Sequence, residues 1–205
     1  MMELERALYD AKAIIFDCDG TLVDSAPVYG KAWAAGFASA GVRIADDWYR
    51  FRNGLSEHIL MDAFEEFSGL KLHREQVIAH MRNAYLENIG ALSEISMIAS
   101  IARKNVGRLP MAVASGGPAA IVVPSLRYLR LDTLFNAIIT LDDVCVPKPA
   151  PNLFIGAARR LNMKPADCVV LEDSDQGIAA AATAGMRCFD VRALARGHDA
   201  PAAGV

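Results

Sequence analysis

The sequence predicts an α/β fold in which helices cover both faces of a parallel β-sheet. Three continuous apolar runs, at 13–16, 111–114 and 168–171, carry this prediction, because such runs are typical of strands buried on both faces. Stretches with helical spacing separate the runs, and this alternation favours a doubly wound sheet. With 205 residues, 53% of them hydrophobic, the chain is long enough for one packed core with a smaller inserted unit.

Two weaker strands and three helices complete the predicted core. The strands are expected at 137–140 and 186–191. Helices are expected at 118–129 and 151–161, each beginning with a proline, which suits the first helical turn. An Ala-rich helix at 174–184 has Ser174 as its expected N-cap. Together these elements predict a Rossmann-like sheet. The residues after 192 are expected to be loosely ordered.

One block interrupts the alternation of strands and helices. Between residues 25 and 92 the sequence has helical periodicity and no convincing strand, with glycines at the breaks. We expect four helices in it, at 28–40, 46–51, 56–67 and 74–88. The sequence therefore predicts an all-α cap subdomain at 25–92, inserted into an α/β core formed by 1–24 and 93–205.

Charge and composition exclude several classes of protein. The 21 Lys and Arg against 24 Asp and Glu leave a net charge of −3, without the clustered basic face that nucleic-acid binding needs. No apolar run approaches the roughly 18 residues that span a bilayer, and the first residues are too acidic for a signal peptide. The four cysteines lack the paired spacing of a zinc site. We expect a soluble, cytoplasmic protein that binds neither nucleic acid nor a membrane, of unknown oligomeric state.

Polar side chains follow the three strongest predicted strands at the point where each ends. Because the carboxyl ends of strands in a parallel sheet meet at one edge, these side chains are expected to converge. Positions i and i+2 of an extended segment point the same way, so two aspartates with that spacing can share one site. The side chains are those of Asp17 and Asp19 after the first strand, Ser115 and Gly116 after the second, and Glu172 and Asp173 after the third.

This set of residues points to phosphoryl transfer. Four carboxylates brought together repel one another unless protons or a cation neutralise them, and Mg²⁺ binds through one or two carboxylates plus a substrate phosphate. Ser115 and the two following glycines offer a hydroxyl and backbone N–H groups at a helix start, which suits an anion. Lys148, held between two prolines, is placed to neutralise a phosphate and to orient a carboxylate.

The motifs, in this order, resemble those of the haloacid dehalogenase superfamily. The first motif corresponds to 17–25 (DCDGTLVDS), the second to Ser115, the third to 148–151 (KPAP) and the fourth to 172–174 (EDS) with the glycines and alanines that follow. Together they cover most of 13–30 and 110–191. The helical block resembles the cap of the β-phosphoglucomutase-like and sugar-phosphate phosphatase branch. The resemblance implies a Mg²⁺-dependent hydrolase of a small phosphomonoester.

The resemblance also implies a role for each motif residue. Asp17 would be the nucleophile that forms an aspartyl-phosphate, and Asp19 the general acid and base. Lys148 would stabilise the charge of the phosphate. The remaining roles are phosphate binding by Thr21, Ser115 and Gly116, and Mg²⁺ binding by Asp17, the backbone carbonyl of Asp19, and Asp173, with Glu172 binding directly or through water.

The cap is expected to contribute substrate contacts when it closes, and Arg52, Asn53 and Glu57 are the predicted residues. Where β-phosphoglucomutases carry a histidine and an arginine, this chain has Tyr29 and Glu57, which favours hydrolysis over transfer. The resemblance is closest to hydrolases of sugar phosphates such as fructose 1-phosphate or 6-phosphogluconate. A β-phosphoglucomutase-type phosphotransferase, a phosphoglycolate phosphatase and a non-catalytic binding relative remain alternatives.

Overall fold

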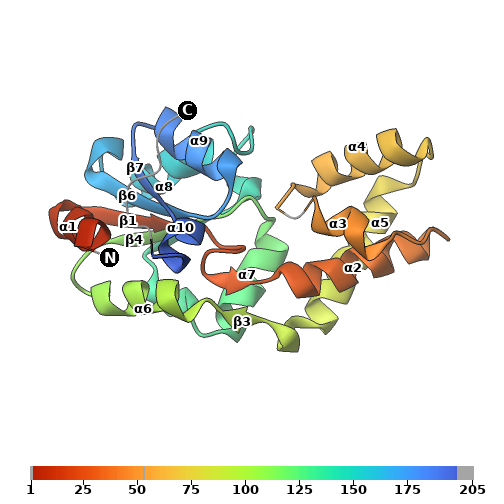
Figure 1. Cartoon of the computed structure of the whole chain (residues 1–205), viewed down its shortest axis with the longest axis horizontal. Helices are drawn as coiled ribbons and strands as arrows, with labels where there is room; N and C mark the ends of the chain where they lie inside the picture. Colours follow the sequence, from red (N-terminus) through yellow and green to blue (C-terminus); the bar gives the residue numbers. More distant parts are fainter. Residues whose placement is uncertain (1, 53, 198–205) are drawn as a thin grey trace.

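A computed structural model of the chain describes residues 2–52 and 54–197. Its central sheet has five parallel strands in the order β5-β4-β1-β6-β7 (Figure 1). The predicted doubly wound α/β sheet is thereby confirmed. The strands are β1 (Ala13–Phe16), β4 (Met111–Ala114), β5 (Ala137–Ile139), β6 (Cys168–Glu172) and β7 (Arg187–Asp190).

Both faces of the sheet are covered by helices, which explains why its strands are continuous apolar runs. Ala13 and Ile15 of β1 pack in the cluster that includes α8 (Asn152–Arg160) and α9 (Asp175–Thr183). Ile14 and Phe16 pack in the cluster on the opposite face, and all four side chains are fully buried. The helices of that face are α1 (Met2–Asp10), α6 (Ser96–Asn105), α7 (Ala119–Tyr128) and α10 (Val191–Ala195).

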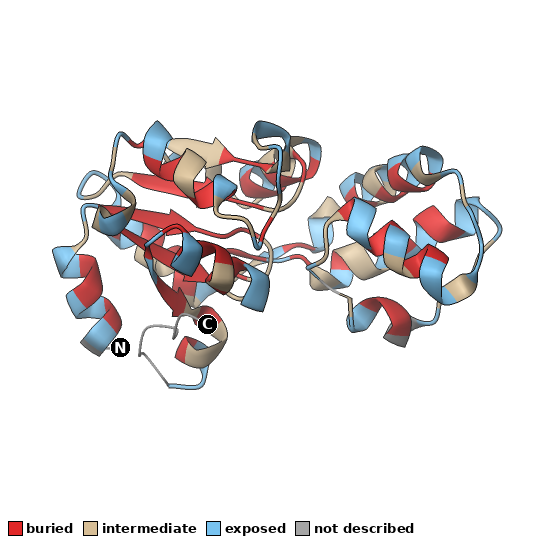
Figure 2. Ribbon diagram, turned by 90° about the horizontal axis from the view of Figure 1, so that it is seen from above, coloured by how far each residue is buried: buried red, intermediate tan, exposed pale blue. Residues whose placement is uncertain are grey.

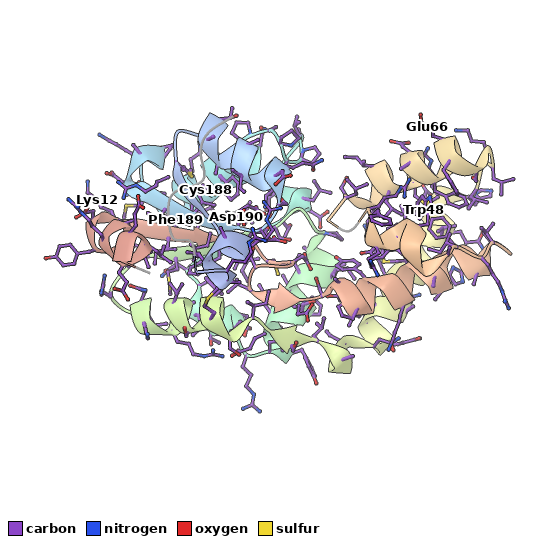
Figure 3. The ribbon with its side chains drawn as sticks, in the orientation of Figure 1. Lys12, Trp48, Glu66, Cys188, Phe189 and Asp190 are labelled. Atoms are coloured by element: carbon purple, nitrogen blue, oxygen red, sulfur yellow. The ribbon has the colours of Figure 1, made fainter. Side chains whose placement is uncertain are left out.

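The register of the strands brings their carboxyl ends to one level. Phe16 of β1 pairs with Val113 of β4 on one side and with Leu171 of β6 on the other. In Figure 3, Lys12, which precedes β1, lies at the end of the sheet remote from the helical bundle, whereas Asp190, at the end of β7, lies on the side facing that bundle. The polar residues that follow the strands therefore gather on the side of the bundle.

The described helices between β2 and β3 form a separate bundle beside the sheet (Figure 2). Its centre is aromatic, with ring centroids 4.4 Å apart for Phe37 and Phe64 and 5.6 Å apart for Trp48 and Phe64. Two of its helices approach so closely that a Cβ on Gly36 would lie 2.8 Å from the backbone oxygen of Val77, so only glycine fits there. The helices are α2 (Ala26–Ser39), α3 (Asp46–Arg50), α4 (Glu57–Ser68) and α5 (Arg74–Glu87).

The chain enters and leaves the bundle through two short antiparallel strands. Val23 of β2 (Val23–Asp24) pairs with Glu94 of β3 (Ser93–Glu94). The predicted boundaries fall at this pair, and we propose the same division, with residues 25–92 as the cap. Short 3₁₀ helices complete the chain at η1 (Ile89–Ala91), η2 (Asp132–Leu134), η3 (Leu141–Asp143) and η4 (Pro165–Asp167).

Several elements were not predicted from the sequence, namely α1, α6, α10, β2 and β3. The expectation of a loosely ordered tail after residue 192 is wrong for the first part of that tail. The side chain of Asp190 accepts a hydrogen bond of 2.8 Å from the backbone N–H of Arg192 and caps α10, while Leu194 is buried against the core. Residues 198–205 lie outside the described residues. Among the described helices, none is long and apolar enough to cross a bilayer.

Candidate active site

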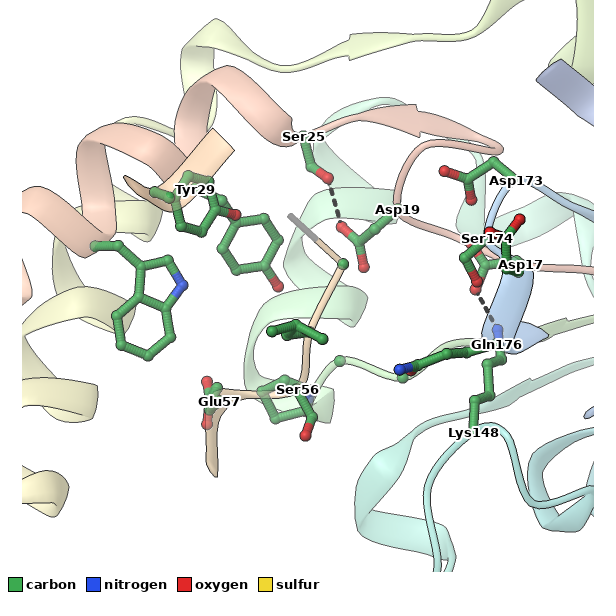
Figure 4. A pocket seen from close by; sticks show the side chains of 18 of the residues that line it. Asp17, Asp19, Ser25, Tyr29, Ser56, Glu57, Lys148, Asp173, Ser174 and Gln176 are labelled. Atoms are coloured by element: carbon green, nitrogen blue, oxygen red, sulfur yellow. Dashed lines mark hydrogen bonds and ion pairs between the residues drawn. The ribbon is translucent and has the colours of Figure 1, made fainter. Parts of the chain in front are cut away.

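A cavity of about 450 Å³ lies between the carboxyl ends of the strands and the helical bundle (Figure 4). The loops after β1, β4 and β6 supply one wall, and α2, α3 and the start of α4 supply the other. The predicted residues that line it are Asp17, Asp19, Glu57, Gly116, Lys148 and Asp173.

Lys148 joins two buried carboxylates at the floor of the cavity. Its Nζ lies 2.6 Å from Oδ1 of Asp17 and 2.7 Å from Oε2 of Glu172. The three side chains come from segments far apart in sequence, and their exposed fractions are 8%, 6% and 0% for Lys148, Asp17 and Glu172. Burial alone lowers the pKa of Lys148, but the two carboxylates outweigh it and the pKa lies above its ordinary value. The lysine is therefore a permanent cation that fixes the position of the Asp17 carboxylate.

Glu172 is the structural anchor of this arrangement. Its second oxygen, Oε1, accepts hydrogen bonds of 2.9 Å from the backbone N–H groups of Asp173 and Ser174 and from the Ser174 hydroxyl. The Ser174 side chain also accepts a bond of 3.0 Å from the backbone N–H of Gly177, so the predicted N-cap is confirmed. A Cβ on Gly177 would lie 1.9 Å from Oε2 of Glu172, which explains the glycine at this position. With these bonds made, Glu172 serves chiefly to place Lys148 and the loop that carries Asp173.

Asp19 also lines the cavity, on the side of Asp17 that is nearer to Ser25 and Tyr29 (Figure 4). Its Oδ1 accepts a hydrogen bond of 2.6 Å from the Ser25 hydroxyl, and its Oδ2 lies 3.4 Å from the Ser115 hydroxyl. Burial raises the pKa of Asp19 above its ordinary value, against the opposite effect of the two hydroxyls. A carboxyl group with a raised pKa beside a cavity is suited to give a proton and to take it back.

Three carboxylates of the site form a cluster that fits a hard cation. Asp17, Glu172 and Asp173 each offer an oxygen within 4.8 Å of the others. Burial, followed by the charge of Glu172, raises the pKa of Asp17 well above its ordinary value and that of Asp173 to about 7. Three carboxylates facing one lysine retain excess negative charge, which a divalent cation would neutralise. The donor set, oxygen atoms only, is the one that Mg²⁺ prefers.

The predicted phosphate-binding residues occupy two different layers of the site. Gly116 lines the cavity, as do Gly117 and Pro118 at the start of α7. Thr21 and Ser115 are fully buried and are not among the described residues that line the cavity. Thr21 donates a hydrogen bond of 3.1 Å to Oδ1 of Asp173, while Ser115 contacts Asp19. In this structure both hydroxyls support carboxylates of the site, and direct contact with a phosphate stays a prediction.

The three substrate contacts predicted in the cap have different outcomes. Glu57 lines the cavity. Arg52 does not belong to the described lining; its guanidinium lies 4.4 Å from the ring centroid of Trp48 and donates to that residue's backbone oxygen at 2.9 Å. The structure thus places Arg52 in the packing of the cap, because its flat guanidinium stacks on the indole of Trp48. The local sequence did not reveal this partner. Asn53 lies outside the described residues.

Other lining residues were not predicted as site residues. Tyr29, Trp33 and Tyr49 form an aromatic wall on the cap side of the cavity, and Gln176 and Arg192 lie on the core side. Aromatic residues in amphipathic helices are usually packed in a core, so their spacing gave no signal of a cavity. Arg192 reaches the site only because α10 folds back beside β7.

Comparisons with known proteins agree with this geometry. Residues 11–185 match the family model of a haloacid dehalogenase-like hydrolase. The chain is 35% identical over 186 residues to the fructose-1-phosphate phosphatase YqaB of Escherichia coli, covering 88% of this chain and 96% of that protein. It is 29% identical over 185 residues to the β-phosphoglucomutase of Bacillus subtilis, covering 85% of this chain and 80% of that protein.

A solved structure shows the same fold. A hydrolase from Pseudomonas syringae superposes with a TM-score of 0.77 at 23% sequence identity, covering 92% of this chain and 91% of that one. The family match spans the core motifs and the helical block alike, since it begins before β1 and ends after α9. The chain belongs to the haloacid dehalogenase-like hydrolase family.

Proposed function

We propose that this protein is a Mg²⁺-dependent phosphatase that hydrolyses a small sugar phosphate through an aspartyl-phosphate on Asp17. The observation that carries the proposal is the position of the Asp17 carboxylate. Lys148 holds one of its oxygens at 2.6 Å at the floor of a cavity that also contains Asp19 and Asp173. A binding protein of the same fold would have no use for a buried carboxylate fixed beside a second carboxyl group able to act as an acid.

The first half of the reaction forms the covalent intermediate. An oxygen of Asp17 attacks phosphorus and the bond from phosphorus to the ester oxygen breaks. Asp19 gives its proton to that oxygen, so the leaving group departs as a neutral alcohol. The raised pKa of Asp19, caused chiefly by burial, favours the protonated form that gives this proton. Lys148 and the backbone around Gly116 stabilise the negative charge on the phosphoryl oxygens.

The second half releases phosphate. Asp19, now ionised, takes a proton from a water molecule as the water oxygen attacks phosphorus. The bond from phosphorus to the Asp17 oxygen breaks, which restores the Asp17 carboxylate and the Asp19 carboxyl group. The same group thus acts as acid and then as base, and the hydrogen bond from Ser25 at 2.6 Å keeps it oriented in both steps.

The metal is proposed to bind at Asp17 and Asp173, with the backbone carbonyl of Asp19 and with Glu172 in a supporting position. Mg²⁺, when bound, supplies positive charge beside the phosphate and lowers the pKa of the carboxylates that bind it. Because burial raises the pKa of Asp17, a bound cation would favour its ionised carboxylate, which is the nucleophilic form.

Hydrolysis is favoured over transfer to a second hydroxyl group by the residue at position 29. Burial, with the charge of Asp19 as a further cause, raises the pKa of Tyr29 well above its ordinary value, so its phenol stays neutral. A histidine can exchange protons near pH 7, whereas a neutral phenol does not. The β-phosphoglucomutase reaction is the alternative, and conversion of β-glucose 1-phosphate to glucose 6-phosphate would reveal it.

The deciding experiment measures phosphate release from a panel of sugar phosphates with the purified protein, with Mg²⁺ and with EDTA. The panel includes fructose 1-phosphate, the substrate named for the relative that is 35% identical. We expect release that requires Mg²⁺ and is lost in Asp17→Asn, which keeps the size of the side chain and removes the nucleophile. Asp10→Asn, at the exposed end of α1, is the matched control and should keep full activity. Release that persists in Asp17→Asn would overturn the proposed mechanism.

A further inference from the structure

We propose that the cavity selects phosphate esters whose leaving group is uncharged and polyhydroxylated, and that Glu57 is the main determinant of this selectivity. The inference rests on the proposed function and narrows its substrate class. It separates neutral sugar phosphates from esters that carry a second anionic group, such as 6-phosphogluconate and phosphoglycolate. The residues that carry it lie on the cavity wall beyond the catalytic carboxylates.

Acidic side chains outnumber basic ones around the cavity. Among the described residues that line it, five carry carboxylates and two carry a positive charge. The two cations are Lys148 and Arg192. Lys148 forms ion pairs with Asp17 and Glu172. Its charge therefore serves the transferred phosphoryl group and the carboxylates of the metal site. The five carboxylates belong to Asp17, Asp19, Glu57, Asp173 and Asp175.

Arg192, the second cation, is bound to two aspartates. Its Nη2 lies 2.7 Å from Oδ1 of Asp175 and 2.9 Å from Oδ2 of Asp190, and its Nε donates to Asp190 at 2.9 Å. The hydrogen bonds from Arg192 to Asp190, and then to Asp175, raise the pKa of the guanidinium above its ordinary value. The two aspartates thus offset the positive charge that Arg192 could offer to a carboxylate on the substrate.

Glu57 places a negative charge on the cap side of the cavity. In Figure 4 its carboxylate lies on the cap side of the cavity, away from Asp19 and Asp17. Arg82 of α5 holds it from behind in a bidentate pair, with Nε to Oε1 at 2.8 Å and Nη2 to Oε2 at 2.6 Å. Glu57 lines the cavity although it is only 7% exposed. Arg82 is not among the described residues that line it. The substrate therefore meets the carboxylate of this pair, and the guanidinium lies behind it.

The same geometry suits a polyol. Each carboxylate oxygen of Glu57 accepts one bond from Arg82 and retains a second lone pair that can accept from a substrate hydroxyl. Gln176 and Ser56 add neutral polar groups, and Tyr29 and Trp33 add aromatic surface against which a carbon chain can pack. The neutral hydroxyl groups of a substrate can form hydrogen bonds with these side chains. A second anionic group on the substrate would instead be repelled by the carboxylate of Glu57.

Two matched pairs of esters test the proposal. Glucitol 6-phosphate and 6-phosphogluconate differ only in a hydroxymethyl group against a carboxylate, and so do 2-hydroxyethyl phosphate and phosphoglycolate. We expect kcat/KM of the wild-type protein to favour the neutral member of each pair by about tenfold or more, as like charges across a partly desolvated site imply. Glu57→Gln removes the facing charge and leaves Arg82 uncompensated, so it should reduce this preference by about tenfold.

Glu65→Gln is the control. Glu65 is on the same helix α4, is equally 7% exposed and pairs with Arg74 of α5 through bonds of 2.8 and 2.7 Å, but does not line the cavity. Glu65→Gln should leave the preference for the neutral ester unchanged. Asp175→Asn, at a side chain that is 89% exposed, removes one of the two carboxylates that bind Arg192 without disturbing the cap and should shift the preference in the same direction as Glu57→Gln.

The outcomes separate the inference from the proposed function. A preference that falls in Glu57→Gln and not in Glu65→Gln supports the inference. Hydrolysis in which the wild type prefers the anionic members, or a preference that Glu57→Gln and Asp175→Asn leave unchanged, overturns the inference while the proposed phosphatase function stands. Absence of phosphate release from every ester of the panel overturns the proposed function itself.

Discussion

Replacement of Lys148 by methionine tests the electrostatic core of the site. Lys148→Met keeps an unbranched apolar side chain only one atom shorter, but removes the charged Nζ, which lies 4.8 Å from the centroid of the Phe154 ring. Asp17 and Glu172 then face each other across a buried space without a cation between them. The two carboxylates must either remain charged at a high energetic cost or take up protons.

The expected loss of stability is large for a single substitution. Breaking a buried ion pair by removing one partner costs about 3–5 kcal/mol, because the remaining charge is left uncompensated. For a chain of 205 residues, each kcal/mol corresponds to about 2–4 °C in Tm, so we expect a fall of roughly 10 °C. The loss should be greater at pH 8 than at pH 5, since the carboxyl groups can take up protons at the lower pH. Phosphate release should fall by about a hundredfold or more, because the charge on the transferring group loses its stabilising cation.

Thermal unfolding followed by circular dichroism, with EDTA present, measures the effect on stability. Lys71→Met is the matched control, since Lys71 also pairs with a glutamate, Glu65, but its side chain is 83% exposed. Exposed pairs contribute about 0–1 kcal/mol, so this variant should unfold within about 3 °C of the wild type. The reasoning would be refuted if Lys148→Met unfolded at the wild-type temperature, or if the two variants lost the same stability.

Two further predictions concern Glu172 and the metal site. Gly177→Ala should lower the free energy of unfolding by about 1–3 kcal/mol and weaken Mg²⁺ binding, because the new methyl group would lie 1.9 Å from Oε2 of Glu172. Gly156→Ala is the control and should have neither effect, because its Cβ would make an ordinary contact at 3.6 Å. Equal losses of stability in urea titrations of the two variants would contradict the role assigned to Glu172. Because the pKa of Asp173 is about 7 in the folded protein against an ordinary value of 3.8, the folded state holds a proton that the unfolded chain has lost between about pH 4 and pH 7. Without Mg²⁺ the free energy of unfolding should therefore fall as the pH rises through this range, and the increase in Tm on adding Mg²⁺ should be larger at pH 8 than at pH 5. Equal increases in differential scanning fluorimetry at the two pH values would show that Mg²⁺ does not compete with this proton.

Local chemistry was sufficient to predict the sheet and the residues at its edge. Four-residue apolar runs such as 13–16 have few alternatives to a strand buried on both faces, and the parallel order of strands brings Asp17, Gly116 and Asp173 to one side. Ser174 was predicted as an N-cap because the preference depends on its own hydroxyl and a backbone N–H three residues away. These features depend on residues close in sequence or on the geometry common to parallel sheets.

Other features depend on contacts between distant segments, which leave no local signal. The two-residue strands β2 and β3 are too short to show a period, and they exist because segments 70 residues apart pair with each other. Arg52 and Glu57 looked equivalent as polar residues at the start of the cap, yet stacking on Trp48 draws one away and the pair with Arg82 directs the other to the cavity. Which charges face a substrate is thus decided by long-range packing, because a side chain's direction depends on partners that the fold brings to it.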